Sequence, residues 1–367
     1  MRTQGLATTE STAGYARRFE TKTATGHFRI AGGLTCSSIG LGTYLGAGDD
    51  DTDERYSAAA RDAIALGCNV IDTAVNYRHQ RSERAVGRAL AEAFADGLAR
   101  ESVVVSTKGG FIPFDGAPPA DRAGWLEETY FRTAVISASE VVADCHCISP
   151  PFIRNMIEIS LRNLRLASVD IYYLHNPETQ LAEVDRGKFI KRMRAVIEAL
   201  EAAADEGKIG VYGTATWNGY RQPAGAPDHL SLAELVAAAR DVAGDGHRFR
   251  ALQLPLNLAM PEALVRRNQI VEGEPLTILE AASRLGMNVV VSGSLYQGQL
   301  ASGLPSDLKD ALPGLKTDAQ RALQFSRSAP GVTTALVGMR SQQHVEENLA
   351  LAAVPPAPAE AFRLLLD

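Results

Sequence analysis

The feature that most constrains the fold is a regular alternation of short apolar runs with longer amphipathic segments. Runs rich in Val, Ile, Leu and Tyr predict eight strands, at residues 38–41, 70–73, 103–107, 171–174, 209–213, 251–254, 288–292 and 334–337. Helical periodicity predicts eight helices, at residues 54–66, 82–95, 151–164, 188–206, 231–243, 276–285, 316–327 and 341–351. Ser82 and Ser341 are suitable N-caps for two of them. Eight strands that are each followed by a helix predict an α/β fold of the (β/α)8 TIM barrel type.

Two connections in this pattern are enlarged βα loops, at residues 109–150 and 218–230. The first is rich in aromatic residues, so we expect it to be folded and to form a wall of the substrate pocket at the C-terminal rim. Its Cys-His-Cys run at 145–147 has no second Cys/His pair at matching spacing, which favours a loop near the site mouth over a metal site. A doubly wound sheet is the alternative fold, but the Gly-Leu-Gly run at 40–42 lacks the third glycine of a dinucleotide-binding turn.

Composition is that of a globular protein with a large core. The chain has 367 residues, of which 46% are hydrophobic and 22% are charged. Residues 1–26 are rich in Thr, Ala, Gly and Ser, and we expect a flexible N-terminal tail there, followed by a single barrel domain over residues 27–367. A formal charge of −6 and no Lys/Arg block argue against a nucleic-acid partner. No apolar run approaches the ~18 residues of a membrane span, so we expect no membrane partner. Four cysteines are too few for a disulfide framework, and we expect a cytoplasmic protein of open oligomeric state.

Four polar side chains come at or just after the ends of predicted strands. They are Asp72, Tyr77, Lys108 and His175. A phenol beside a lysine and a carboxylate is an acid whose proton can be given up near neutral pH, and a histidine adds a hydrogen-bond donor for a substrate oxygen. Each of the four also has a purely structural interpretation, but their joint position at strand ends indicates proton transfer to or from a carbonyl or alcohol oxygen.

The motifs around these residues resemble those of the aldo-keto reductase family, and the likeness runs from about Gly33 to Leu351. The quoted segments are Gly67-x-Asn69-x-Ile71-Asp72-Thr73-Ala74 with Tyr77, Ser82-Glu83-x-x-Val86-Gly87-x-Ala89-Leu90, Thr107-Lys108, Ser160-Leu161-x-Asn163-Leu164 with Asp170-Ile171-x-x-x-His175, and Gly338 with Glu346-Glu347-Asn348. The resemblance implies a reductase that interconverts a carbonyl (aldehyde, ketone or sugar lactol or lactone) and an alcohol by hydride transfer. NADPH is the implied cofactor, with NADH less favoured, and it would lie across the barrel rim.

The resemblance also implies roles for individual residues. Tyr77 would protonate the carbonyl oxygen, Lys108 would lower the pKa of Tyr77, Asp72 would hold Lys108, and His175 would orient the carbonyl. The implied cofactor-binding residues are Gly42, Thr43, Tyr44, Asp72, Thr216, Gln253, Ser292, Ser294, Leu295, Gly298, Gly338, Arg340, His344, Glu347 and Asn348. The expected substrate residues are Tyr44, Phe111, Trp125, Asn176 and Trp217.

The chain departs from the family pattern at three places. Ala215-Thr216 stands where the family commonly has Ser-Asn, and the run at 292–295 replaces Tyr-Ser-Pro-Leu, so the aromatic residue that stacks on the nicotinamide is missing. Trp217 or Tyr296 would have to compensate. The family's lysine for the 2′-phosphate is also absent, and Arg340 or His344 is the candidate replacement. A cofactor-binding regulatory or sensor barrel, or a lyase or isomerase on the same fold, is the alternative function. Gln253 favours a bound cofactor.

Overall fold

The protein is seen here as a computed structural model that describes residues 2–312, 314–358 and 362. Eight parallel strands close into a barrel in the order β11-β12-β3-β4-β5-β6-β7-β8. Their bounds are β3 (Ile39–Gly42), β4 (Val70–Asp72), β5 (Val104–Gly109), β6 (Val169–His175), β7 (Ile209–Ala215), β8 (Phe249–Pro255), β11 (Asn288–Ser292) and β12 (Val332–Gly338). All eight expected strands are present, and the (β/α)8 barrel is confirmed.

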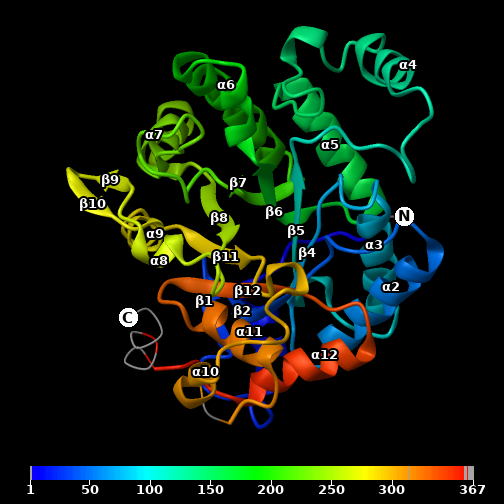
Figure 1. The fold of residues 1–367 in the computed structure, drawn as a ribbon. Helices are drawn as coiled ribbons and strands as arrows, with labels where there is room; N and C mark the ends of the chain where they lie inside the picture. Colours follow the sequence, from blue (N-terminus) through cyan, green and yellow to red (C-terminus); the bar gives the residue numbers. More distant parts are fainter. Residues whose placement is uncertain (1, 313, 359–361, 363–367) are drawn as a thin grey trace.

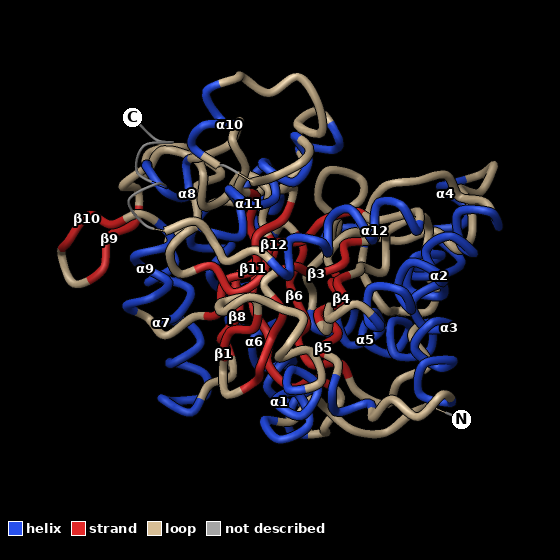
Figure 2. Tube along the Cα trace, turned by 90° about the horizontal axis from the view of Figure 1, so that it is seen from below, coloured by secondary structure: helices blue, strands red, loops and turns tan. Residues whose placement is uncertain are grey.

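Eight helices follow these strands and surround them, so that the strands occupy the centre of the molecule and the helices its periphery (Figures 1 and 2). They are α2 (Asp50–Ala65), α3 (Arg81–Ala95), α5 (Pro150–Asn163), α6 (Arg186–Asp205), α7 (Leu232–Ala243), α9 (Ile278–Arg284), α11 (Asp318–Ser328) and α12 (Gln342–Leu349). The helix α5, for example, turns an apolar face inward with Phe152, Met156 and Leu161. In the part of the chain that is described, no helix is both long and apolar enough to cross a membrane.

The two expected serine N-caps differ in outcome. The Ser341 side chain accepts the His344 backbone N–H and caps α12, as expected. Ser82, by contrast, lies inside α3, which begins after Gln80. The Ser82 hydroxyl is buried and donates to the Thr43 carbonyl at 2.8 Å. It therefore ties α3 to the exit of β3 in place of capping the helix.

Several smaller elements lie outside the eight βα units. They are α1 (Thr9–Arg17), the hairpin of β1 (Phe28–Ala31) and β2 (Leu34–Ser37), the hairpin of β9 (Gln269–Val271) and β10 (Glu274–Leu276), and the short helices α4 (Arg122–Leu126), α8 (Glu262–Val265) and α10 (Asp307–Ala311). The expected long loop after β5 is folded and carries α4, which lies at the outer edge of the molecule beyond α5 (Figure 1).

The N-terminal segment differs from the flexible tail expected there. Thr8 caps α1, and the buried Tyr15 ring packs 5.0 Å from the Phe19 ring centroid. The Tyr15 hydroxyl donates to the Ile64 carbonyl at 2.5 Å, and the Ala7 backbone N–H donates to Asp170 at 2.6 Å. These contacts fasten the segment across the N-terminal end of the barrel, because two aromatic residues in an otherwise polar run bury enough surface to hold it.

Candidate active site

The four candidate catalytic residues converge at the C-terminal end of the barrel. Asp72 ends β4, Lys108 lies near the end of β5, and His175 ends β6, so three adjacent parallel strands deliver them to one rim. Tyr77 lies in the turn between β4 and α3. The three residues that follow it, 78–80, all have positive φ angles (49°, 57° and 72°), and this left-handed turn leads the chain into α3.

A buried ion pair lies beneath the phenol. Lys108 Nζ is 2.5 Å from Asp72 Oδ2 and 2.8 Å from the Thr73 carbonyl. It also lies 4.9 Å from the centroid of the Tyr77 ring, and the His175 ring centroid is 5.7 Å from that of Tyr77. The four side chains expected to act together therefore lie at one place, in the order Asp72, Lys108, Tyr77 and His175.

Asp72 receives two further hydrogen bonds through its other oxygen. Ser106 Oγ donates to Oδ1 at 2.6 Å and Gln253 Nε2 donates to it at 2.9 Å. Gln253, one of the implied cofactor-binding residues, lines the cavity described below and also holds Asp72. Ser106, Gln253 and Lys108 together fix the position of the Asp72 side chain.

The protonation states differ from one sequence expectation. Burial raises the pKa of Tyr77 well above its usual value of 10, and the Asp72 charge raises it further. Lys108 was expected to lower this pKa, but with Lys108 Nζ 4.9 Å from the ring centroid the pKa still lies above its usual value, because of burial and the Asp72 charge. Burial lowers the pKa of Lys108, an effect that Asp72 opposes, and burial lowers the pKa of His175 well below 6.5. At neutral pH the site holds a protonated phenol and a neutral imidazole.

His175 is oriented from two sides. Its Nδ1 lies 3.2 Å from Asn76 Oδ1, and its ring packs edge-on against Phe111 at 5.1 Å between centroids. The next residue, Asn176, has a left-handed conformation with φ 46°, and its N–H donates to the Ala215 carbonyl at 2.6 Å. The chain therefore turns sharply off β6 directly after the imidazole.

A cavity opens from Tyr77 and Asp72 along the rim, with a volume of about 1260 Å³ counting the open space at its mouth. It brings together all but one of the residues that the resemblance implied for the cofactor. The residues in common are Gly42, Thr43, Tyr44, Asp72, Gln253, Ser292, Ser294, Leu295, Gly298, Gly338, Arg340, His344, Glu347 and Asn348. Thr216 is buried nearby and does not line it. Several lining residues were not anticipated, among them Leu45, Tyr56, Gly293, Gln297, Ala301, Leu336 and Val337.

The outer end of the cavity is polar and carries positive charge. Arg340 is exposed, directly precedes the α12 N-cap, and its Nη1 would lie 3.4 Å from a Cβ placed on Gly46. Among the described residues no carboxylate pairs with it. The amide oxygen of Asn348 is buried without a hydrogen-bond partner in the same set. This end therefore offers a cation, a helix N-terminus and an unused acceptor.

The expected substrate residues lie in three places. Tyr44 is half-exposed, lines the cavity and has its ring centroid 5.0 Å from that of Tyr77. Trp217 does not line the cavity but lies next to Gly293, which does, since its indole would be 3.9 Å from a Cβ placed there. Phe111 and Asn176 flank His175. Trp125 instead packs against Phe114 and Tyr130 at 5.1 and 5.3 Å, inside the long loop's own aromatic cluster.

Three residues that support the site were missed by sequence reasoning. Ser106 lies two positions before Lys108 on the same strand, so the period-two alternation of a strand was a usable signal. Asn76 and His146 contact His175 at 3.2 and 2.7 Å, but only through the folded loops. The run at 145–147 was expected near the site mouth, but the sequence did not indicate that His146 or Asn76 would contact His175.

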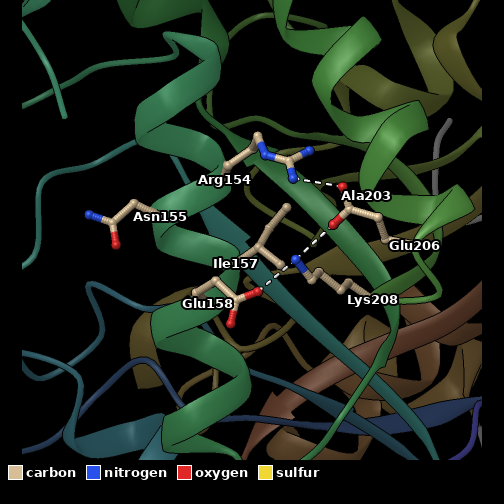
Figure 3. Close-up of a pocket in the computed structure, with 7 residues that line it drawn as sticks. All are labelled: Arg154, Asn155, Ile157, Glu158, Ala203, Glu206 and Lys208. Atoms are coloured by element: carbon tan, nitrogen blue, oxygen red, sulfur yellow. Dashed lines mark hydrogen bonds and ion pairs between the residues drawn. The ribbon is translucent and has the colours of Figure 1, made fainter.

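A second, smaller hollow of about 470 Å³, again counting open space, lies between α5 and α6 (Figure 3). Its charged groups are paired with one another: Arg154 with Glu206 at 2.6 Å, and Lys208 with Glu158 and Glu206 at 2.8 and 2.7 Å. These half-exposed pairs leave no unmatched charge in the hollow, so it is part of the outer surface and not a second reaction site.

Comparison with known families matches residues 38–302 to the model of the Aldo/keto reductase family. The chain belongs to this family. Among relatives of this aldo/keto reductase, the uncharacterized oxidoreductase YqkF of Bacillus subtilis is 23% identical over 325 residues, 87% of this chain and 88% of its own. The NADH-specific methylglyoxal reductase of Escherichia coli is 29% identical over 50% of this chain and 49% of its own. A probable voltage-gated potassium channel subunit beta of Arabidopsis thaliana is 23% identical over 88% of this chain and 90% of its own.

Solved aldo/keto reductases share the fold over nearly their full length. The holo form of an aldo-keto reductase from Bacillus halodurans is 22% identical, with 92% of this chain and 95% of that chain covered and a TM-score of 0.61. An aldo/keto reductase from Klebsiella pneumoniae in complex with NADP and acetate is 23% identical, with 93% and 94% covered and a TM-score of 0.61. The expected family and barrel are confirmed, and the protein is by family an oxidoreductase.

Proposed function

We propose that this aldo/keto reductase is an NADPH-dependent enzyme that interconverts an aldehyde, ketone or sugar lactol or lactone with the corresponding alcohol. The observation that carries the proposal is the Tyr77 phenol. It lines the cavity, and both Lys108 and His175 contact its ring. A protonated phenol backed by a lysine is suited to donate a proton to an oxygen on which negative charge develops.

The residues along the cavity suit NADPH. Arg340 and the N-terminus of α12 would hold the 2′-phosphate, because guanidinium pairs with phosphate through two hydrogen bonds and a helix N-terminus favours anions. Asn348, whose amide oxygen is buried and unpartnered, would bind the adenosine end. The Klebsiella pneumoniae neighbour in complex with NADP supports this choice, whereas the Escherichia coli relative is named as NADH-specific. When bound, NADPH supplies the hydride.

Each of the four central residues has a distinct task in this proposal. Tyr77 keeps its proton until the carbonyl oxygen gains charge and then donates it, since its pKa is raised by burial. Lys108 stabilises the phenolate that results, and Asp72 holds Lys108 at 2.5 Å. His175 donates Nε2–H to the same carbonyl oxygen. That role requires Nδ1 to be an acceptor, so the Asn76 amide must present its NH2 group to it.

Two measurements test the proposal. Titration of the purified protein with NADPH should show saturable binding by ultraviolet absorbance or fluorescence. Tyr77→Phe should leave the NADPH affinity nearly unchanged and lower turnover on a carbonyl substrate by about 100-fold or more, the range for a positioned general acid. The matched control is Tyr173→Phe, because the Tyr173 hydroxyl is buried without a partner among the described residues and does not line the cavity. Full activity in the Tyr77 variant would show that the role is assigned wrongly.

A further inference from the structure

The long loop after β5 closes on itself next to the catalytic rim. The backbone N–H of Ile112 donates to the Cys145 carbonyl at 2.8 Å, and that of Cys147 donates to the Gly110 carbonyl at 2.8 Å. These two bonds pair the outgoing and returning ends of the loop as a short antiparallel ladder. The ladder places His146, the residue between the two cysteines, beside the end of β6.

The His146 side chain is completely buried and fully engaged. Its Nε2 lies 2.7 Å from the His175 carbonyl oxygen, and its Nδ1 lies 2.8 Å from Gln180 Nε2. The other end of the Gln180 amide accepts a hydrogen bond from the Arg192 guanidinium. Arg192 can only donate, so Gln180 turns its oxygen to Arg192 and its NH2 group to His146. Nδ1 of His146 is therefore the acceptor, and Nε2–H donates to the His175 carbonyl.

The surroundings leave room for this contact and no more. A Cβ on Gly110 would lie 2.6 Å from the His175 carbonyl oxygen and 2.9 Å from His146 Nε2, so only glycine permits the two to meet. The Phe111 ring packs edge-on against both imidazoles, 5.0 Å from His146 and 5.1 Å from His175. The long loop is thus built to reach the backbone of His175.

We propose that His146 is a positioning residue for His175, a role that rests on the function proposed above. The hydrogen bond fixes the His175 carbonyl at the point where the chain turns off β6 through the left-handed Asn176. With that carbonyl and the Asn76 contact both held, the His175 imidazole has one direction relative to Tyr77. Arg192 orients the Gln180 amide, and Gln180 in turn fixes the His146 tautomer. The Nε2–H of His146 therefore stays directed at the His175 carbonyl oxygen.

The chain supplies a matched control for this proposal in His27. His27 is also completely buried, its Nε2 lies 3.0 Å from the Gly67 carbonyl, and its Nδ1 lies 3.3 Å from Ser38 Oγ. It lies at the N-terminal end of the barrel, before β3 and β4. The two histidines therefore share burial and bonding pattern and differ in which end of the barrel they hold.

The experiment compares Asn and Gln substitutions at both positions in the full-length chain. The Gln amide reaches the place of Nε2 and preserves its donor, whereas the shorter Asn loses it. We expect His146→Asn to lower kcat by about tenfold, as misplacement of a catalytic group does. The NADPH Kd should stay within about twofold, and His146→Gln should recover most of kcat. His27→Asn should lower the thermal midpoint with kcat unchanged. Equal kcat in His146→Asn and the parent, or equal kcat losses at both positions, would overturn the proposal.

Gln180→Glu tests the same contact if His146→Asn does not fold. A carboxylate at 180 would pair with Arg192 and demand a proton on His146 Nδ1, so the bond to His175 would survive only in the doubly protonated imidazole. The groups facing that imidazole are Arg192 from α6, His175 from β6 and the adjacent Cys147. We expect kcat to fall as the pH rises through the pKa of His146 in this variant, a step that the parent lacks. An unchanged pH profile would overturn the proposal.

Nitrogen NMR of the histidine rings separates this proposal from the proposed function. Parent protein with no turnover on carbonyls would contradict the function, and the ring signals would still report the contact. The parent should show His146 as the Nε2–H tautomer, and His146→Asn should shift the His175 signals while His27→Asn does not. Unmoved His175 signals in the His146 variant would contradict the positioning role alone.

Discussion

The barrel buries two ion pairs of similar exposure at opposite ends, and they differ in what surrounds them. Lys108 and Asp72 lie at the C-terminal end, with side chains 0% and 3% exposed. Arg100 and Asp170 lie at the N-terminal end, with side chains 2% and 3% exposed. Burial and charge pairing alone therefore do not mark a reaction site. The Lys108–Asp72 pair, at the C-terminal end, adjoins the Tyr77 phenol and an open cavity. The Arg100–Asp170 pair, at the N-terminal end, is covered by the N-terminal segment.

The two carboxylates are also held by different kinds of donor. Asp170 accepts the backbone N–H groups of Ala7 at 2.6 Å and Val105 at 2.7 Å. Asp72 accepts side-chain donors, Ser106 and Gln253. Backbone N–H donors remain whatever side chain the donating residue carries, so the hydrogen bonds to Asp170 join distant parts of the chain in a structural role. The side-chain donors at the C-terminal rim fix the position of the Asp72 carboxylate, as a reaction site requires.

The largest expected effect comes from removing the cation of each pair. Arg100→Met should lower the free energy of unfolding by about 3–5 kcal/mol, because it leaves a buried carboxylate without its partner. Turnover per folded molecule should stay unchanged. Lys108→Met should lower turnover by about 100-fold or more, in the range of a lost acid–base group. It should destabilise less than Arg100→Met, since Asp72 lines an open cavity.

Urea unfolding measures the loss of stability in both variants, and steady-state kinetics measures the loss of turnover. Arg100→Met protein that is fully folded but inactive would contradict the division between the two ends. So would a Lys108→Met variant that loses stability and keeps its turnover.

The next largest expected effect is on the pH dependence of stability, through the buried His27 and His146 at the two ends of the barrel. Burial lowers the pKa of His27 and of His146 from 6.5 to about 4. Below pH 6.5 the unfolded chain therefore binds protons that the folded chain does not. The stability that each neutral histidine contributes is full above pH 6.5, falls as the pH drops towards 4, and then levels off. The slope is about 1.4 kcal/mol per pH unit for each group.

Chemical unfolding of His27→Asn and His146→Asn between about pH 4.5 and 6 measures this slope. Each substitution should flatten the pH dependence of the unfolding free energy by about 1.4 kcal/mol per unit, whatever it does to stability at pH 7. Both ends should behave alike in this respect, although only the His146 variant should lose turnover. A slope identical to that of the parent would mean that the histidine is charged inside the fold.

Much of this arrangement could be predicted from the sequence, and the rest depended on distant contacts. Periodicity located the eight strands, and strand ends located Asp72, Lys108 and His175. The helix α1 could not be predicted, because Tyr15 and Phe19 are apolar residues in a polar run and bury themselves only against residues far along the chain. The raised pKa of Tyr77 likewise could not be predicted, because it comes from the burial of the phenol in the folded site and from the nearby Asp72 charge.

An exposed cation gives the next smaller effect. Arg340 lies at the outer end of the cavity and is exposed, whereas Arg100 is buried. Arg340→Ala should leave the unfolding free energy unchanged within about 0.5 kcal/mol, as surface changes do. It should weaken NADPH binding by about 1–3 kcal/mol, the range for a hydrogen bond to a charged group, and should hardly alter NADH binding. Equal losses for the two cofactors in a fluorescence titration would rule out a contact with the 2′-phosphate.

The smallest expected effect tests the kind of donor that holds each carboxylate. Ser106→Ala removes the 2.6 Å hydrogen bond to Asp72 Oδ1 and leaves the contacts from Lys108 and Gln253 in place. Because those contacts remain, we expect a loss of only about 1 kcal/mol, seen as a fall of about fivefold in kcat. The NADPH affinity should hold and the change in unfolding free energy should be smaller than that of Arg100→Met. At Asp170 no single side-chain change can imitate this, since two of its donors are backbone N–H groups. If Ser106→Ala altered stability and left kcat unchanged, the side-chain donors to Asp72 would have a structural role too. The cavity would then be the difference between the two ends of the barrel.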